Sequence, residues 1–234
     1  MRKKRPALHL LGAIFIIFAI VLGILVAAAR AVPNMESSLY GFVRYGYRRL
    51  TSLHCPVLMT TQDRLPVTIR LNNPLDKTLT WYVNTQLSTP LIMATDKQTF
   101  ELQPGETRTI SYEVDKSNID LYTFIFVHAF GSAGSLGMRE ATCGTFILPL
   151  SITGGPTIYY TALGLGTIFA VLGLWLWFRH ADMSEPAVVS RSWWLRFLLL
   201  LIALAIITSI FIWWFFSILL LVLTMLTLIV ALFR

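Results

Sequence analysis

Residues able to do chemistry are few in this 234-residue chain, and they are widely spaced. The four histidines are His9, His54, His128 and His180, and no metalloprotease, hydrolase or phosphate-loop motif surrounds them. A histidine ligates a haem or a pigment only when it faces the cofactor, and no neighbouring residue supports such a site. We therefore predict that the protein is not an enzyme and that it binds no cofactor.

The two cysteines, Cys55 and Cys143, are the other reactive residues. A structural zinc site usually has four protein ligands, so two thiolates alone do not form one. A site that combined His54 with both cysteines would still lack a clear fourth ligand. We therefore predict no metal site.

The composition is that of a chain with membrane-embedded segments. Apolar residues make up 56% and charged residues 13%, which excludes a disordered chain and argues against a single soluble globule. The net charge is +7, but residues 30–156 hold eleven basic and ten acidic residues, so that segment is nearly neutral. We therefore predict no nucleic-acid partner.

A charge-free run over residues 7–29 is long enough to span a bilayer as a helix. The basic cluster Arg2–Arg5 precedes it and predicts a cytoplasmic N-terminus of residues 1–6 under the positive-inside rule. The alternative is a cleaved signal peptide, because residues 27–31 offer small side chains at cleavage-like spacing.

Three further transmembrane helices are predicted towards the C-terminus. The first spans residues 157–178, and the final apolar block is too long for one helix, so we divide it into 197–213 and 215–233. The aromatic residues Trp213 and Trp214 fall at the division, as expected of rings at the membrane interface.

The predicted topology places both termini in the cytoplasm. The loop 179–196 carries three arginines and is predicted to be cytoplasmic, whereas residues 30–156 are predicted to be extracytoplasmic. The expected location is the plasma membrane of a prokaryote, because the outer segment has no N-glycosylation motif.

Small residues at helical spacing predict close helix packing within the membrane. They are Ala19 and Gly23 in the first helix, and Ala162, Gly166, Ala170 and Gly173 in the second. The partner of these stripes is either another helix of the same chain or a second membrane protein subunit.

Residues 34–54 carry apolar side chains at steps of three and four, which predicts an amphipathic connecting helix capped by Asn34. This helix either rises beside the outer domain or lies flat on the membrane.

After residue 55 the sequence shows the alternation of apolar and polar residues that is typical of strands. It is clearest in 65–71, 79–83 and 110–114, and it indicates about seven strands. We therefore predict a two-sheet antiparallel sandwich over residues 55–152.

Three motifs in this segment resemble those of a known group of domains. The stretches Leu71–Pro74, Leu102–Thr107 and Ile110–Val114 resemble the Ig-like sandwiches of bacterial and archaeal surface proteins, the CARDB-like group. The resemblance implies a fold and an adhesive or spacer-like role, and it transfers no catalytic residues. In many such sandwiches the first and last strands are parallel neighbours, which implies a disulfide between Cys55 and Cys143; the alternative is two free buried thiols.

The sequence thus predicts an α+β membrane protein with four transmembrane helices and one extracytoplasmic Ig-like antiparallel β-sandwich between helices one and two. The predicted function is that of a non-enzymatic accessory or assembly subunit. Its expected partners are the lipid bilayer and other membrane subunits or further copies of the chain. Two alternatives stay open: a surface receptor or sensor, and a component of a transporter or membrane enzyme whose site is shared with another chain.

Overall fold

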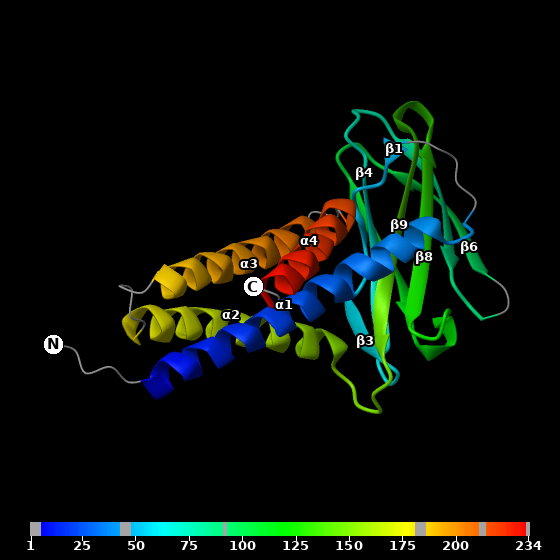
Figure 1. Ribbon diagram of the computed structural model, residues 1–234. Coiled ribbons are helices and arrows are strands. Elements are labelled where there is room, and N and C mark those ends of the chain that lie inside the picture. Colours follow the sequence, from blue (N-terminus) through cyan, green and yellow to red (C-terminus); the bar gives the residue numbers. More distant parts are fainter. Residues whose placement is uncertain (1–5, 43–47, 91–92, 181–185, 211–213, 233–234) are drawn as a thin grey trace. The chain divides into compact units, whose positions relative to one another are not determined.

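The computed structural model describes residues 6–42, 48–90, 93–180, 186–210 and 214–232 (Figure 1). The chain divides into two compact units. The helical unit comprises residues 1–31 and 157–234, and the sheet unit comprises residues 32–156.

Four helices are described in the chain: α1 (Pro6–Leu39), α2 (Gly155–His180), α3 (Pro186–Ile210) and α4 (Trp214–Leu232). Two of them, over Leu10–Leu39 and Gly155–Arg179, are long and apolar enough to cross a membrane. The apolar stretches of α3 and α4, Trp193–Thr208 and Phe215–Leu228, are shorter than the roughly 20 residues a bilayer core requires. The prediction of four transmembrane helices is therefore wrong for the described residues.

The helix boundaries also correct the sequence prediction. Residues 34–54 do not form a separate connecting helix, because α1 continues to Leu39 and two short strands follow. Asn34 does not begin a helix, and the hydroxyl of Ser37 donates to its backbone carbonyl at 2.9 Å within α1. The predicted cytoplasmic loop 179–196 is largely helical, because α3 begins at Pro186.

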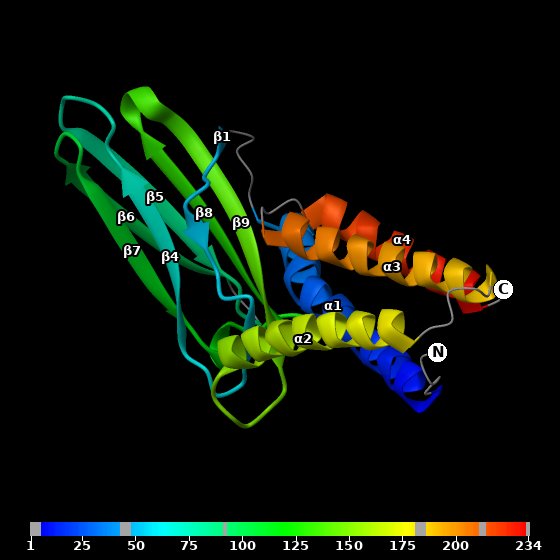
Figure 2. The ribbon, with the colours of Figure 1, turned by 90° about the vertical axis from the view of Figure 1, so that its left-hand side faces the viewer.

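The sheet unit contains nine described strands in two sheets (Figure 2). They are β1 (Arg48–Arg49), β2 (Leu53–His54), β3 (Leu58–Thr60), β4 (Leu65–Asn72), β5 (Leu79–Leu87), β6 (Ala94–Leu102), β7 (Thr107–Val114), β8 (Phe124–Ala133) and β9 (Gly137–Leu148). One sheet has the order β1-β9-β8-β5-β6, with β3 also paired to β9, and the other has the order β2-β4-β7.

The larger sheet is mixed, which corrects the prediction of a purely antiparallel sandwich. Both β1 and β3 pair with β9 in parallel, whereas the β9–β8, β8–β5 and β5–β6 pairs are antiparallel. The parallel pairing arises because the chain enters the sheet alongside its own last strand. The likeness to Ig-like domains stays a prediction.

Both sheets contribute to one hydrophobic core. Val67 and Ile69 from β4 and Trp81 and Val83 from β5 are all at most 2% exposed. Their spacing of two residues follows from the strand repeat, which sends alternate side chains to the same face. The predicted strand alternation therefore identified the inward-facing residues of β4 and β5 correctly.

Candidate functional site

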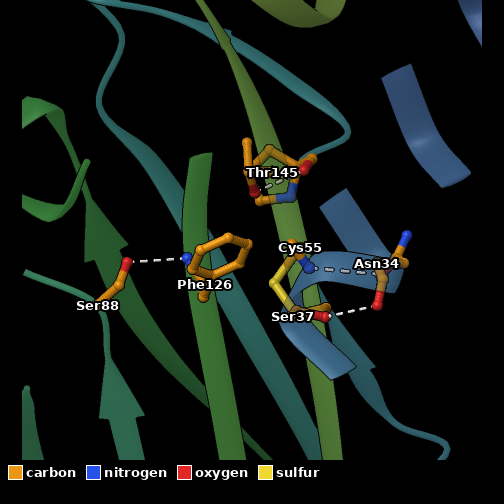
Figure 3. The surroundings of a disulfide bond; sticks show 9 residues. Asn34, Ser37, Cys55, Ser88, Phe126 and Thr145 are labelled. Carbon is orange, nitrogen blue, oxygen red and sulfur yellow. Dashed lines mark hydrogen bonds between the residues drawn. A yellow bond between two sulfur atoms is a disulfide. The ribbon is translucent and has the colours of Figure 1, made fainter. Parts of the chain in front are cut away.

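The predicted disulfide between Cys55 and Cys143 is confirmed (Figure 3). Cys143 lies within β9 and Cys55 lies between β2 and β3, with a Cα–Cα distance of 6.1 Å. The bond closes a loop of 88 residues and lies in the core of the sheet unit. Beside it, the hydroxyl of Thr145 donates to the backbone carbonyl of Pro56 at 2.8 Å, which holds the β2–β3 connection against β9.

The last turns of α1 belong to the sheet unit and contact the outer face of its larger sheet. Gly144 of β9 lies directly beneath the carbonyl of Pro33, where a β-carbon would collide with that group. The backbone N–H of Gly144 donates to the side-chain carbonyl oxygen of Asn34 at 3.4 Å. The missing side chain at Gly144 therefore permits the close approach of helix and strand.

Aromatic and polar side chains continue this contact beyond the end of α1. The phenol of Tyr40 donates to the carboxylate of Asp120, and its ring lies 4.7 Å from that of Phe126. Burial, together with the adjacent Asp120 carboxylate, raises the pKa of Tyr40 to about 12. Tyr40 is therefore a neutral phenol at ordinary pH and serves as a hydrogen-bond donor.

Of the two histidines whose side chains the structure describes, His128 lies in the interior, at 2% exposure. Its ring stacks on Phe42 at 5.4 Å, its Nδ1 lies 3.2 Å from Gln86, and its Nε2 lies 3.4 Å from Glu140. These contacts hold the ring in place between strand and loop. His54 is exposed, and the described residues contain no group of three His, Cys, Asp or Glu that could hold a metal ion.

Asp63 organises the junction where the chain leaves the sheets. Its carboxylate accepts hydrogen bonds from the backbone N–H groups of Thr60 at 2.8 Å, Gly154 at 2.7 Å and Gly155 at 2.8 Å. Burial acts to raise the pKa of this carboxyl, but the three backbone donors outweigh it and hold the pKa below its usual value. Asp63 was not identified from the sequence, because two of its three partners lie more than 90 residues away.

The small-residue stripes lie inside the helical unit. A β-carbon at Gly173 would lie 3.0 Å from the backbone oxygen of Gly12 in α1, and one at Gly23 would collide with Ile202 of α3. The remaining stripe residues, Ala19, Ala162, Gly166 and Ala170, border an apolar cavity of about 280 Å³.

Of the two predicted interface aromatics, Trp213 lies outside the described residues and Trp214 begins α4.

A second cavity, of about 300 Å³, lies in the sheet unit where β4 ends and β9 begins. Arg70 of β4 and Arg139 of β9 line it, together with the buried indole of Trp81. We call it the arginine cavity. Arg139 is near the start of β9 (Gly137–Leu148), so the cavity lies about 30 Å along that strand from Leu148. No local sequence motif marks this cavity, since its walls come from separate strands.

Comparisons with known proteins do not assign a family. No protein-family model matches the chain, and no curated protein matches it. Among solved structures, a Bacteroides uniformis beta-glucuronidase is 17% identical over 36% of this chain and 11% of its own, with a TM-score of 0.30. A Listeria innocua beta-glucosidase is 16% identical over 43% of this chain and 16% of its own, with a TM-score of 0.27. The periplasmic chaperone SfaE is 11% identical over 44% of this chain and 58% of its own, with a TM-score of 0.28.

This chain therefore spans about a tenth to a sixth of the two glycosidases and less than two thirds of the chaperone. Likenesses with TM-scores this low assign neither a fold family nor an activity to it.

Proposed function

We propose that the protein is anchored in the plasma membrane by α1 and α2, and that residues 32–156 lie outside the cytoplasm. The observation that carries this placement is the disulfide between Cys55 and Cys143 in the segment that joins the two helices. Disulfides persist in oxidising compartments and are rare in the cytosol. The basic residues Arg2–Arg5 before α1 support a cytoplasmic N-terminus.

Within this placement, the protein acts as a non-enzymatic accessory or assembly subunit of a larger membrane complex. The described helices expose large apolar side chains such as Ile168 at 53% and Val171 at 62%, which suits contact with lipid or with another subunit. Gly166 faces Leu22 of α1 beside the apolar cavity, so the exposed apolar side chains of α2, and not the small-residue stripe, form the surface offered to a partner. Further copies of this chain are the simplest alternative partner.

Gentle detergent extraction followed by native mass spectrometry tests this role. We expect a stable complex with another membrane subunit or with further copies of the chain. The variant Ile168→Asn removes an exposed apolar side chain from α2 and should weaken the complex, whereas Ile168→Leu keeps the apolar surface and should not. A monodisperse monomer for the unmodified protein would contradict the proposal.

A receptor or sensor role is the second candidate, and the arginine cavity favours it. The cavity volume of about 300 Å³ is at the lower end of the range for small-molecule sites. In this role the sheet unit binds a ligand outside the cytoplasm. The resemblance to Ig-like domains of surface proteins fits both candidates.

A further inference from the structure

The charge of the arginine cavity is uniformly positive. Arg70 and Arg139 line it, and no aspartate or glutamate does. Neither guanidinium forms a hydrogen bond or an ion pair with any residue in the described part of the chain. The two arginines therefore face this space without a compensating negative charge from the described residues.

The acidic residues nearest in sequence have other contacts. Glu140 follows Arg139 in β9, so its side chain emerges on the opposite face of the sheet, where it contacts His128 at 3.4 Å. The carboxylate of Glu106 accepts a hydrogen bond from the backbone N–H of Gln103 at 2.7 Å within its own turn. Arg48, exposed and paired in register with Arg139, adds a further positive charge on the neighbouring strand.

The wall of the cavity also contains polar atoms without partners. Trp81 Nε1, Arg139 Nε and Ser52 Oγ are buried, and none has a hydrogen-bond partner among the described residues. All three residues line the cavity. Indole and guanidinium nitrogens only donate hydrogen bonds, so the groups that would satisfy them are acceptors. Polar atoms this well buried are normally paired in folded proteins.

The indole of Trp81 is held in a fixed orientation. A β-carbon at Gly131 would lie 3.1 Å from Cζ3 and 3.5 Å from Cε3 of this ring, so that edge packs on the strand β8. The Nε1 atom lies on the opposite edge of the ring. Because Trp81 is 2% exposed, it contributes a rigid wall.

We propose that the arginine cavity binds the oxyanion of a small ligand, a carboxylate or a phosphate group, through the guanidinium groups of Arg70 and Arg139. Guanidinium matches both oxyanions because its N–H groups form a planar fork that can donate two parallel hydrogen bonds. Seating the anion brings acceptors towards the unpartnered polar atoms of Trp81, Ser52 and Arg139. Access to ligands outside the cell depends on the proposed topology, whereas the binding itself does not.

Binding can be measured on the full-length protein in phosphatidylcholine nanodiscs by isothermal titration calorimetry, with inorganic phosphate and acetate as separate probes. We expect saturable binding of at least one probe, and weaker binding at high salt. Arg70→Gln and Arg139→Gln should each weaken binding by about tenfold or more, because each removes charge-assisted hydrogen bonds.

The matched control is Arg64→Gln. Arg64 is an exposed arginine just before β4, at the opposite end of that strand from Arg70, and it pairs with Asp115 at 3.2 Å. This variant makes the same change in net charge and should bind the probes as the unmodified protein does. Equal losses in all three variants, or no saturable binding of either probe, would overturn the proposal. If Arg139→Gln fails to fold, the exposed Arg70 still decides the outcome.

A second arm distinguishes a free ligand from a lipid headgroup. The titrations are repeated in nanodiscs that contain phosphatidylglycerol. Unchanged affinity for the probe supports a free oxyanion ligand. A lower apparent affinity for the probe in these nanodiscs, seen with the unmodified protein but not with Arg139→Gln, supports a lipid headgroup as the source of the same oxyanion.

Discussion

The carboxylate of Asp63 accepts a hydrogen bond at 2.8 Å from the backbone N–H of Gly155, a residue 92 positions later. Gly155 is the first residue of α2, and the first N–H groups of a helix have no partner within the helix. Asp63 therefore caps the first turn of α2 within the sheet unit, which extends to residue 156. A β-carbon at Gly155 would lie 2.5 Å from Cα of Met59, so this junction requires glycine.

Replacing Asp63 with alanine should destabilise the sheet unit. The change leaves the N–H groups of Thr60, Gly154 and Gly155 without their acceptor. We expect the free energy of unfolding to fall by about 2–4 kcal/mol. Pulse proteolysis in urea on the detergent-solubilised protein measures this change. Asp76→Ala, at an exposed loop position, is the control and should change the free energy by less than about 0.5 kcal/mol.

Acid should weaken the same junction. The pKa of Asp63 is lowered in the folded protein, so its contribution to stability is present above the ordinary carboxyl pKa and is lost as the pH falls through the lower folded value. The urea midpoint should therefore decrease as the pH falls below about 4. The hydroxyl and N–H of Ser117 lower the pKa of Asp115, which adds to this decrease. Asp63→Asn should flatten the profile, and an unchanged slope would contradict the assignment.

The disulfide should contribute a large part of the stability of the sheet unit. Cross-linking Cys55 to Cys143 restricts an 88-residue loop in the unfolded chain, which corresponds to about 4–5 kcal/mol in the chain-entropy model. The double variant Cys55→Ala with Cys143→Ala should lose a comparable free energy of unfolding. Non-reducing peptide mapping of the unmodified protein checks the pairing directly, and a peptide map with two free thiols would refute it.

Gly144→Ala should separate the end of α1 from β9. The added methyl group collides with the carbonyl of Pro33, which is backbone and cannot rotate away. We expect a loss of about 1–3 kcal/mol and faster hydrogen exchange over residues 34–42. Gly41→Ala, at a position with no neighbour within 4 Å, is the matched control. Equal exchange in the two variants would show that this close approach does not hold α1 in place.

The sequence predicted the strands in which apolar and polar side chains alternate. It did not predict the segment 34–54 correctly, where apolar residues happen to recur at helical spacing. Alternation identified β4, β5 and β7 because each has one face in the core. Leu50 and Leu53 fit helical spacing, yet both are at most 5% exposed in the core of the sheet unit, where short strands and turns place them. Helical periodicity over 34–54 thus arose from a helix end followed by strand residues.

The Asp63 site and the arginine cavity could not be predicted from local sequence patterns. Asp63 lies 92 positions from Gly155, and Arg70 lies 69 positions from Arg139, so no local motif joins either pair. The disulfide could be predicted because the chain has only two cysteines and the resemblance to Ig-like domains implied that the first and last strands are neighbours. In the final apolar block the division into two helices matches α3 and α4, but their apolar stretches, Trp193–Thr208 and Phe215–Leu228, are shorter than a bilayer core requires.

The most direct test of the account is the side of the membrane on which the sheet unit lies. A cysteine introduced by Asp76→Cys, at an exposed position of that unit, is treated in intact cells with a membrane-impermeant maleimide. Ser184→Cys, which follows α2 in the sequence, serves as the cytoplasmic reference. We predict that the first variant is labelled and that the second is labelled only after the cells are lysed. Labelling of Asp76→Cys only after lysis would place residues 32–156 in the cytoplasm and contradict the account.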